Sequence, residues 1–341
     1  MSSWKNFRHR LERRGLEFLA WGVPRLSRRA CVALSLALGE VAFVLDRRGR
    51  TVAEANLACA LGERCTPAER RKIARASYRN FARTMVDLFW AQNLTPSNFH
   101  NYLHLEGFEA FRERHERSPG GSIALCVHNG NWEWAGLALG FAGIPSIIVA
   151  EDFKNPLLSD IFSRLRQTSG CTIIPQEKSM LRLLKAVKRG SATGMLIDLS
   201  LHPTQAATII EAFGLKMCVS LLHTVLALRA GTLLVPLETV PLPDGTCRVI
   251  AHPPVDFPAG ARPHEIAQRC WDVFEPILRA RPESWLWPYK HFRYRPRHAG
   301  SAYPDYANDS SEFEELLLGI SAERTSTSEV EAGLTGEDRS S

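Results

Sequence analysis

From residue 122 onward, short apolar runs alternate with longer amphipathic stretches, and this alternation constrains the fold more than any other feature. Helices are expected near residues 132–141, 155–169, 178–189, 218–230 and 263–279. Strands that alternate with helices predict an α/β fold, in which helices flank a single mixed sheet. The apolar runs with strand character are SIALCV, IPSIIVA, CTIIP, TGMLID, ATIIEAF, TLLVPLETV and TCRVIAH.

The first fifty residues differ from this body in charge and hydropathy. They hold 11 Lys or Arg against 4 Asp or Glu. Within them, residues 30–45 are apolar but short for a bilayer span, which needs about 20 residues, and arginines flank both ends. We therefore predict a helical segment that lies on a membrane surface, with Trp21 as an interfacial anchor. A buried helix of the soluble domain is the alternative.

Composition and charge divide the chain into three segments. With 45% hydrophobic and 23% charged residues, the chain is globular. Residues 301–341 hold 2 Lys or Arg against 10 Asp or Glu. We predict a membrane-associated segment over 1–50, a catalytic α/β domain over 51–298, and an acidic tail over 299–341. The tail should be mostly disordered, with at most one short helix at the leucines 316–318.

The charge also limits the partners. A basic body suits phospholipid head groups, nucleic acid or an acidic carrier protein. The sequence lacks zinc-ligand spacing, a helix-turn-helix signature and RNP-like aromatics, which argues against nucleic acid. It also lacks GxSxG, which argues against a serine hydrolase. Eight cysteines without a CxxC pair indicate a reducing compartment.

The motif with the clearest chemistry is SIALCVHNGNWEW, where a strand ends at His128 and a helix begins near Asn131. Ligands of open α/β sheets bind at the carboxyl ends of strands. On one continuous helix His128 and Glu133 would point about 140° apart, so a turn through Gly130 must bring them together. We expect Glu133 to bond one imidazole nitrogen and leave the other as a base. The alternative is a structural histidine beside a surface carboxylate.

HNGNWEW resembles the signature of the bacterial lipid A late acyltransferases, the lauroyl and myristoyl transferases of the lysophospholipid acyltransferase-like superfamily with its H-x4-D/E motif. The resemblance covers about residues 5–297. The sequence departs from the family at Leu199, where glutamine is usual, and at residues 215–218. Further matches follow in family order: NPLL at 155–158, Arg164 and Arg166 in SRLRQTSG, Asp198 in GMLIDLS, Phe213-Gly214, and PESWLWPYKHFRYRP.

The resemblance implies a glycerol-3-phosphate acyltransferase-like fold and an O-acyltransferase of lipopolysaccharide biosynthesis. A fatty acyl group would pass from an acyl carrier protein or coenzyme A thioester to a hydroxyl of a lipid A precursor, with no cofactor and no metal. The enzyme would work at the cytoplasmic face of the inner membrane. Alternative acceptors are a glycolipid of the phosphatidylinositol mannoside type or a lysophospholipid, and a further alternative is an inactive membrane scaffold.

The resemblance also suggests roles for individual residues. His128 would be the general base, assisted by Glu133. Arg164 would bind a phosphate, or else be a solvated surface arginine, and Asp198 would lie at the substrate rim or cap a turn. Backbone N–H groups of Gly130 and Asn131 would stabilise the oxyanion. Five aromatic residues are candidates for an acyl groove, with at least half of them expected in the core: Trp132, Trp134, Trp285, Trp287 and Phe292.

Overall fold

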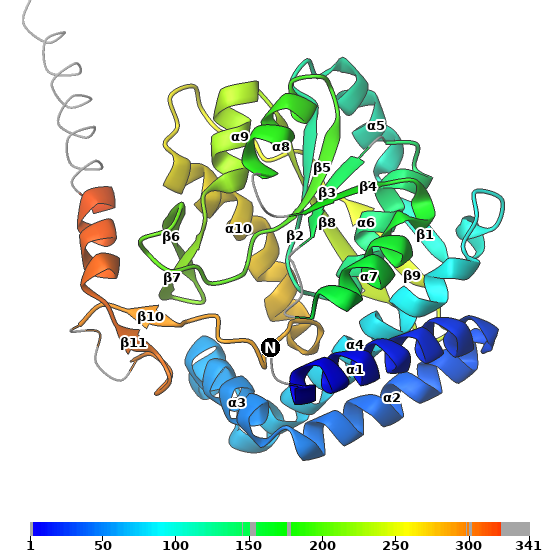
Figure 1. Cartoon of the computed structure of the whole chain (residues 1–341). Helices are drawn as coiled ribbons and strands as arrows, with labels where there is room; N and C mark the ends of the chain where they lie inside the picture. Colours follow the sequence, from blue (N-terminus) through cyan, green and yellow to red (C-terminus); the bar gives the residue numbers. More distant parts are fainter. Residues whose placement is uncertain are drawn as a thin grey trace, which may run out of the picture.

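The computed structural model describes residues 3–144, 146–150, 155–175, 179–297, 299 and 302–321. A seven-stranded sheet with the order β1-β9-β8-β2-β5-β3-β4 forms its centre (Figure 1). Strands β8 and β9 pair antiparallel and the other neighbours pair parallel, so the predicted mixed α/β sheet is confirmed. The strands are β1 Leu103–Glu106, β2 Ser122–Cys126, β3 Ser146–Ala150, β4 Thr172–Pro175, β5 Ala192–Leu196, β8 Leu233–Pro241 and β9 Cys247–Ala251.

Helices cover both faces of this sheet, which is why the central strand β2 is buried at every position. Successive side chains of β2 point to opposite faces. Ile123 and Leu125 join one core cluster with α8, α9 and α10, whereas Ala124 and Cys126 join another with α5, α6 and α7. These helices are α5 Phe108–Arg117, α6 Trp132–Phe141, α7 Ser159–Arg166, α8 Ser179–Val187, α9 Leu222–Ala230 and α10 Pro263–Ala280.

The strand β7 is one of the elements that were not predicted, together with β1, α5, β10 (Tyr294–Arg295) and β11 (Asn308–Asp309). The helix expected from residue 218 begins at Leu222, because β7 (Leu215–Ser220) pairs antiparallel with β6 (Ala207–Ala212). The connecting residues Phe213 and Gly214 have φ angles of 55° and 83°, the left-handed conformation that tight hairpins require. Phe213 accepts this strain while its ring packs against a cluster of tryptophans.

The N-terminal quarter forms the helices α1 (Ser3–Gly22), α2 (Arg28–Leu45), α3 (Arg47–Leu61) and α4 (Pro67–Trp90), coloured blue to cyan in Figure 1. Thr66 caps α4 in a capping box with Glu69, and Pro67 occupies the first helical position, so the Thr66-Pro67 pair of the sequence marks this helix start. One side of α2 is buried through Cys31, Ser35, Gly39 and Phe43, while its other side is exposed. None of the described helices combines the length and the apolar character that crossing a membrane requires.

The C-terminal region is folded for longer than the sequence suggests. Within the predicted disordered tail, residues 311–321 form a helix. Phe313, Leu316 and Leu317 pack it against the β6–β7 hairpin. Their spacing places them on one face of the helix, so the short helix expected at the leucines is present and has a partner surface. Residues 322–341 lie outside the described part of the chain. A further pair of short strands, β10 (Tyr294–Arg295) and β11 (Asn308–Asp309), precedes this helix.

Candidate active site

His128 lies just beyond the carboxyl end of β2, at the sheet edge where α/β proteins bind ligands. Asp198 follows the neighbouring parallel strand β5, so the two residues meet at the same edge. The backbone N–H of His128 donates to Oδ2 of Asp198 over 2.8 Å, and Nδ1 lies 2.8 Å from Oδ1. A carboxylate only accepts, so the proton is on Nδ1, and Nε2 keeps its lone pair to act as a base.

Asp198 is fully buried and has a third donor, the indole N–H of Trp285 at 2.8 Å. Burial by itself raises the pKa of Asp198, but the contacts with His128 outweigh it and lower the pKa to about 2. Behind this group, His291 stacks on Trp285 with the ring centroids 3.8 Å apart. Burial lowers the pKa of His291 to about 4, so it is neutral near pH 7. Asp198 is therefore an ionised carboxylate held in one orientation.

Glu133 occupies the first turn of α6, as predicted, but its carboxylate has a different partner from the one expected. It accepts two hydrogen bonds from Arg166, at 2.9 and 2.7 Å, in the bidentate geometry that guanidinium favours. The predicted partner of the imidazole was Glu133, and the structure assigns Nδ1 to Asp198 instead. The physical reason is that Arg166 of α7, which packs beside α6, engages both carboxylate oxygens.

Of the two arginines in the SRLR motif, Arg166 rather than Arg164 reaches this site. Residues two apart on a helix point about 160° away from each other. Arg166 therefore faces α6, and Arg164 lies exposed on the opposite side of α7. The structure does not bring Arg164 to the residues around His128.

The turn between His128 and α6 differs from the prediction in how its N–H groups are used. Gly130 has a φ of 53°, so the left-handed turn expected at this glycine is present. However, the N–H of Gly130 donates to the carbonyl of Ser284 at 3.0 Å, and the N–H of Asn131 donates to Oγ1 of Thr239 at 2.8 Å. Both groups are buried and paired within the protein, so neither is free in this structure to serve as the oxyanion donor that the sequence predicts.

Among the candidate groove aromatics, Trp132 has the most direct relation to His128. The two rings meet edge to face with centroids 5.1 Å apart, and the other side of Trp132 stacks on the half-exposed Phe81. The remaining four are completely buried, so the core role expected for at least half of the set is confirmed: Trp134, Trp285, Trp287 and Phe292.

The described residues also bear on two other possibilities, a cysteine nucleophile and a metal site. Burial raises the pKa of Cys126, two residues before His128, to about 12, so its thiol is protonated and a poor nucleophile. Across the described ranges, no three His, Cys, Asp or Glu side chains gather in a way that would hold a metal ion.

Sequence reasoning did not assign roles to Arg166 or His291, and it considered Trp285 only for an acyl groove or the core. All three lie within motifs that were recognised, SRLRQTSG and PESWLWPYKHFRYRP, but a motif does not reveal which side chain faces the site.

Fold and site together define an α/β protein with a histidine–carboxylate pair at the carboxyl edge of its sheet. Residues 16–294 match the model of the bacterial lipid A biosynthesis acyltransferases, and the chain belongs to this family. The lipid A biosynthesis lauroyltransferase of Escherichia coli (strain K12) is 23% identical over 287 residues, which cover 83% of this chain and 92% of that protein.

Proposed function

We propose that the protein moves a fatty acyl group from an acyl carrier protein or coenzyme A thioester to a hydroxyl of a lipid A precursor, with His128 as general base. Family membership supports the acyl transfer and the class of acceptor. The single observation that carries the catalytic assignment is the bond between Nδ1 of His128 and the buried Asp198, because it leaves Nε2 as the basic nitrogen.

In the proposed reaction, Nε2 removes the proton of the acceptor hydroxyl as its oxygen attacks the thioester carbonyl. The new ester C–O bond forms, the C–S bond breaks, and the imidazolium returns the proton to the departing thiolate. Asp198 stabilises the imidazolium between these steps. General-base catalysis of this kind contributes about 10²–10⁴-fold to the rate.

Glu133 and Arg166 have a supporting role in this proposal. Their side chains are 8% and 22% exposed, so the pair lies at the boundary between the core and the site. Pairing with Glu133 raises the pKa of Arg166 against the effect of burial, which keeps the guanidinium charged. Because the charge of Glu133 balances that of Arg166, we assign the pair to holding the first turn of α6 in place rather than to binding an anion.

The reaction is tested by incubating the purified protein with labelled acyl carrier protein and acyl coenzyme A thioesters and a panel of acceptors. The panel includes a lipid A precursor, a phosphatidylinositol mannoside and a lysophospholipid. Transfer to the lipid A precursor, lost in His128→Ala with an unchanged melting temperature, is expected. Transfer only to another acceptor would replace the proposed substrate. No transfer at all would favour the scaffold alternative.

We also propose that the outer surface of α1 and α2 binds the cytoplasmic face of the inner membrane. Both helices expose large apolar side chains, and basic residues surround those of α1, a combination suited to anionic lipid head groups. On α1 the spacing of these residues forms one stripe along the helix. The exposed residues are Trp4, Phe7, Leu11, Phe18, Leu19 and Trp21 on α1, and Leu36, Leu38, Val41, Val44 and Leu45 on α2.

Vesicle flotation tests this surface. The double substitution Phe18→Ser and Trp21→Ser should reduce binding to vesicles that contain phosphatidylglycerol. Leu181→Ser is the matched control, because Leu181 is equally exposed but lies on α8. Equal losses in the two variants would contradict the assignment to α1.

A further inference from the structure

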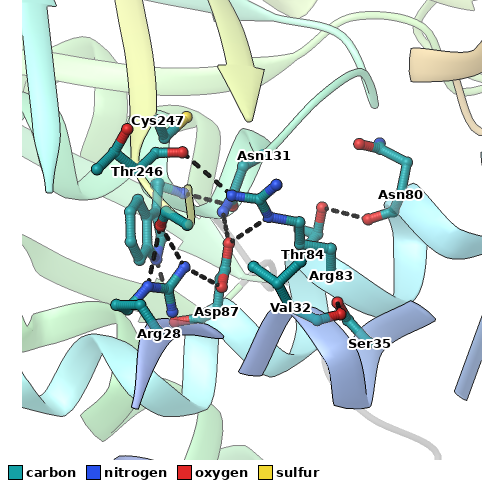
Figure 2. A network of polar contacts seen from close by, with 12 residues as sticks. Arg28, Val32, Ser35, Asn80, Arg83, Thr84, Asp87, Asn131, Thr246 and Cys247 are labelled. Atoms are coloured by element: carbon teal, nitrogen blue, oxygen red, sulfur yellow. Dashed lines mark hydrogen bonds and ion pairs between the residues drawn. The ribbon is translucent and has the colours of Figure 1, made fainter. Parts of the chain in front are cut away.

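Asp87 of α4 is a buried carboxylate that joins three parts of the chain. It is 1% exposed, and Figure 2 shows it between Arg28 and Arg83, with Asn131 on a third side. Its oxygens lie 2.6 Å from a terminal nitrogen of Arg28, 3.4 Å from Nε of Arg83 and 3.0 Å from Nδ2 of Asn131. Burial raises the pKa of Asp87, whereas the two guanidinium groups act to lower it and supply the partners that a buried carboxylate requires.

At one end of this network, the side chain of Asn131 has a fixed orientation. Its Oδ1 accepts the N–H of Trp134 at 3.2 Å and so caps the start of α6. Its Nδ2 donates to Asp87. Rotating the amide by half a turn would place a donor against a donor and an acceptor against a carboxylate. Asp87 therefore determines which way the N-cap residue of α6 points, three positions after His128.

At the other end, Arg28 belongs to the first turn of α2. Its guanidinium donates to the carbonyl of Gly245, in the β8–β9 hairpin, at 2.9 and 2.6 Å. It also lies over the rings of Trp90 and Trp134, 4.5 and 5.1 Å from their centroids. These contacts therefore link the first turn of α2 to the same carboxylate that orients Asn131.

Side chains on the same face of α4 also bind Gly130, the residue of the turn that precedes Asn131. Asn80 and Thr84 donate to the carbonyl oxygen of Gly130 at 2.9 and 2.8 Å. Spacings of four and three residues place Asn80, Thr84 and Asp87 in one row along the helix. Three successive polar side chains of α4 thus fix Gly130 and Asn131, between His128 and Glu133.

We propose that Asp87 is a positioning residue for acyl transfer, which orients Asn131 and thereby the turn that carries His128, and which links this turn to α2. The proposal rests on the proposed function. Asp87 is 1% exposed and contacts the turn from within the protein, so its loss should affect the chemical step more than substrate binding. A misplacement of about 1 Å can cost about 100-fold in rate.

Four variants test the proposal. Asp87→Asn removes the charge, and Asn131→Asp places two carboxylates side by side. In the double variant the amide at position 87 donates to the carboxylate at position 131, so the hydrogen bond is restored with its direction reversed. The carboxylate at position 131 can still cap α6. Glu40→Gln is the matched control, because Glu40 forms the other ion-pair link between α2 and α4, with Arg75 and Arg79, away from the turn.

Each variant is measured by kcat and KM and by amide hydrogen exchange over residues 128–134. We expect Asp87→Asn to lower kcat about 10–100-fold with KM within threefold. Exchange at Gly130 and Asn131 should become faster in this variant. The double variant should recover most of both effects, and Glu40→Gln should change neither, even where it lowers the melting temperature.

Three outcomes would overturn the proposal: wild-type kcat and exchange in Asp87→Asn, no recovery in the double variant, or equal effects in Glu40→Gln. Hydrogen exchange does not depend on the substrate. If the wild-type protein transfers no acyl group, the proposed function fails while the exchange data still test the positioning by Asp87.

Discussion

Nδ1 of His128 lies 2.8 Å from Oδ1 of Asp198, a residue 70 positions further along the chain. The acid that orients the imidazole therefore comes from the neighbouring strand of the sheet. Glu133, five residues after the histidine, is bonded to Arg166 instead. The two acidic residues at this site thus have separate partners, and substitutions should distinguish their roles.

Asp198→Asn should abolish most of the proposed activity without changing the fold. The amide oxygen would still accept the backbone N–H of His128 and the indole N–H of Trp285. The NH₂ group would then face Nδ1 of His128. The imidazole would then take the other tautomer, with its proton on Nε2. We expect kcat to fall about 10²–10⁴-fold, measured as initial rates of acyl transfer between pH 6 and 9. A loss below fivefold would contradict the role of Asp198.

Glu133 and Arg166 should be strongly coupled in stability. Glu133→Gln and Arg166→Met each leave a partly buried charge without its partner, at a cost of about 2–4 kcal/mol. In the double variant neither charge remains, so its loss should be smaller than the sum of the two by at least about 1 kcal/mol. Urea unfolding of the four proteins measures this difference. Additive losses would show that the pair is not coupled.

Gly130→Ala should be far more damaging than Gly143→Ala, although both glycines have a positive φ. A Cβ at 130 would lie 2.1 Å from the carbonyl oxygen of Thr239, whereas a Cβ at 143 meets nothing within 4 Å. Gly143→Ala should cost only the backbone strain, about 1–2 kcal/mol. Gly130→Ala should cost more and lower kcat, because the turn must move. Melting temperatures and kcat of both variants check this, and equal destabilisation would contradict it.

His223 should make the protein less stable in acid. It is completely buried in α9, its Nε2 finds no hydrogen-bond partner among the described residues, and burial lowers its pKa to about 4. The unfolded chain, with a histidine pKa of about 6.5, binds an additional proton between pH 6.5 and 4. The free energy of unfolding therefore falls as the pH drops through this range, by on the order of 3 kcal/mol for one such histidine.

His223→Leu should reduce this pH dependence. His291, which also has a pKa lowered to about 4, contributes in the same direction and remains in the variant. Urea unfolding at pH 7 and pH 5 should show a fall in stability that is smaller than in the wild-type protein by about 1–2 kcal/mol. An identical fall in both proteins would show that His223 does not titrate as described.

Sequence patterns predicted the fold well wherever local signals were strong. The alternation of apolar runs located the central strands, and the Thr66-Pro67 pair located the start of α4. The hairpin strand β7 was missed because its apolar residues run directly into α9, and periodicity cannot divide a short apolar run. The folded part of the tail was underestimated, because its stability depends on the β6–β7 surface rather than on its own composition.

The active site was predicted only in part, since partners across the fold depend on register and helix phase. The turn at Gly130 and the place of His128 at a strand end follow from local sequence. The choice between Arg164 and Arg166 requires the phase of α7, and the contact between His128 and Asp198 requires the pairing of β2 with β5. The role of Asp87 could not be predicted, because the pattern of α4 indicates only a helix with an apolar stripe. The sequence does not show which residues its polar side chains contact.

The turn around Gly130 can be completed only after residues late in the chain have been synthesised. The carbonyl of Ser284 and the N–H of Leu286 bind Gly130 and His128, so the turn is completed by residues near the end of the folded body. At about 5–20 residues per second, roughly 15–60 s pass before the ribosome has made them. Helices α1 and α2 are made well before that. Under the proposed membrane binding, a nascent chain would reach the lipid surface through these helices before the turn that carries its histidine is complete, and the proposed activity would follow only after arrival.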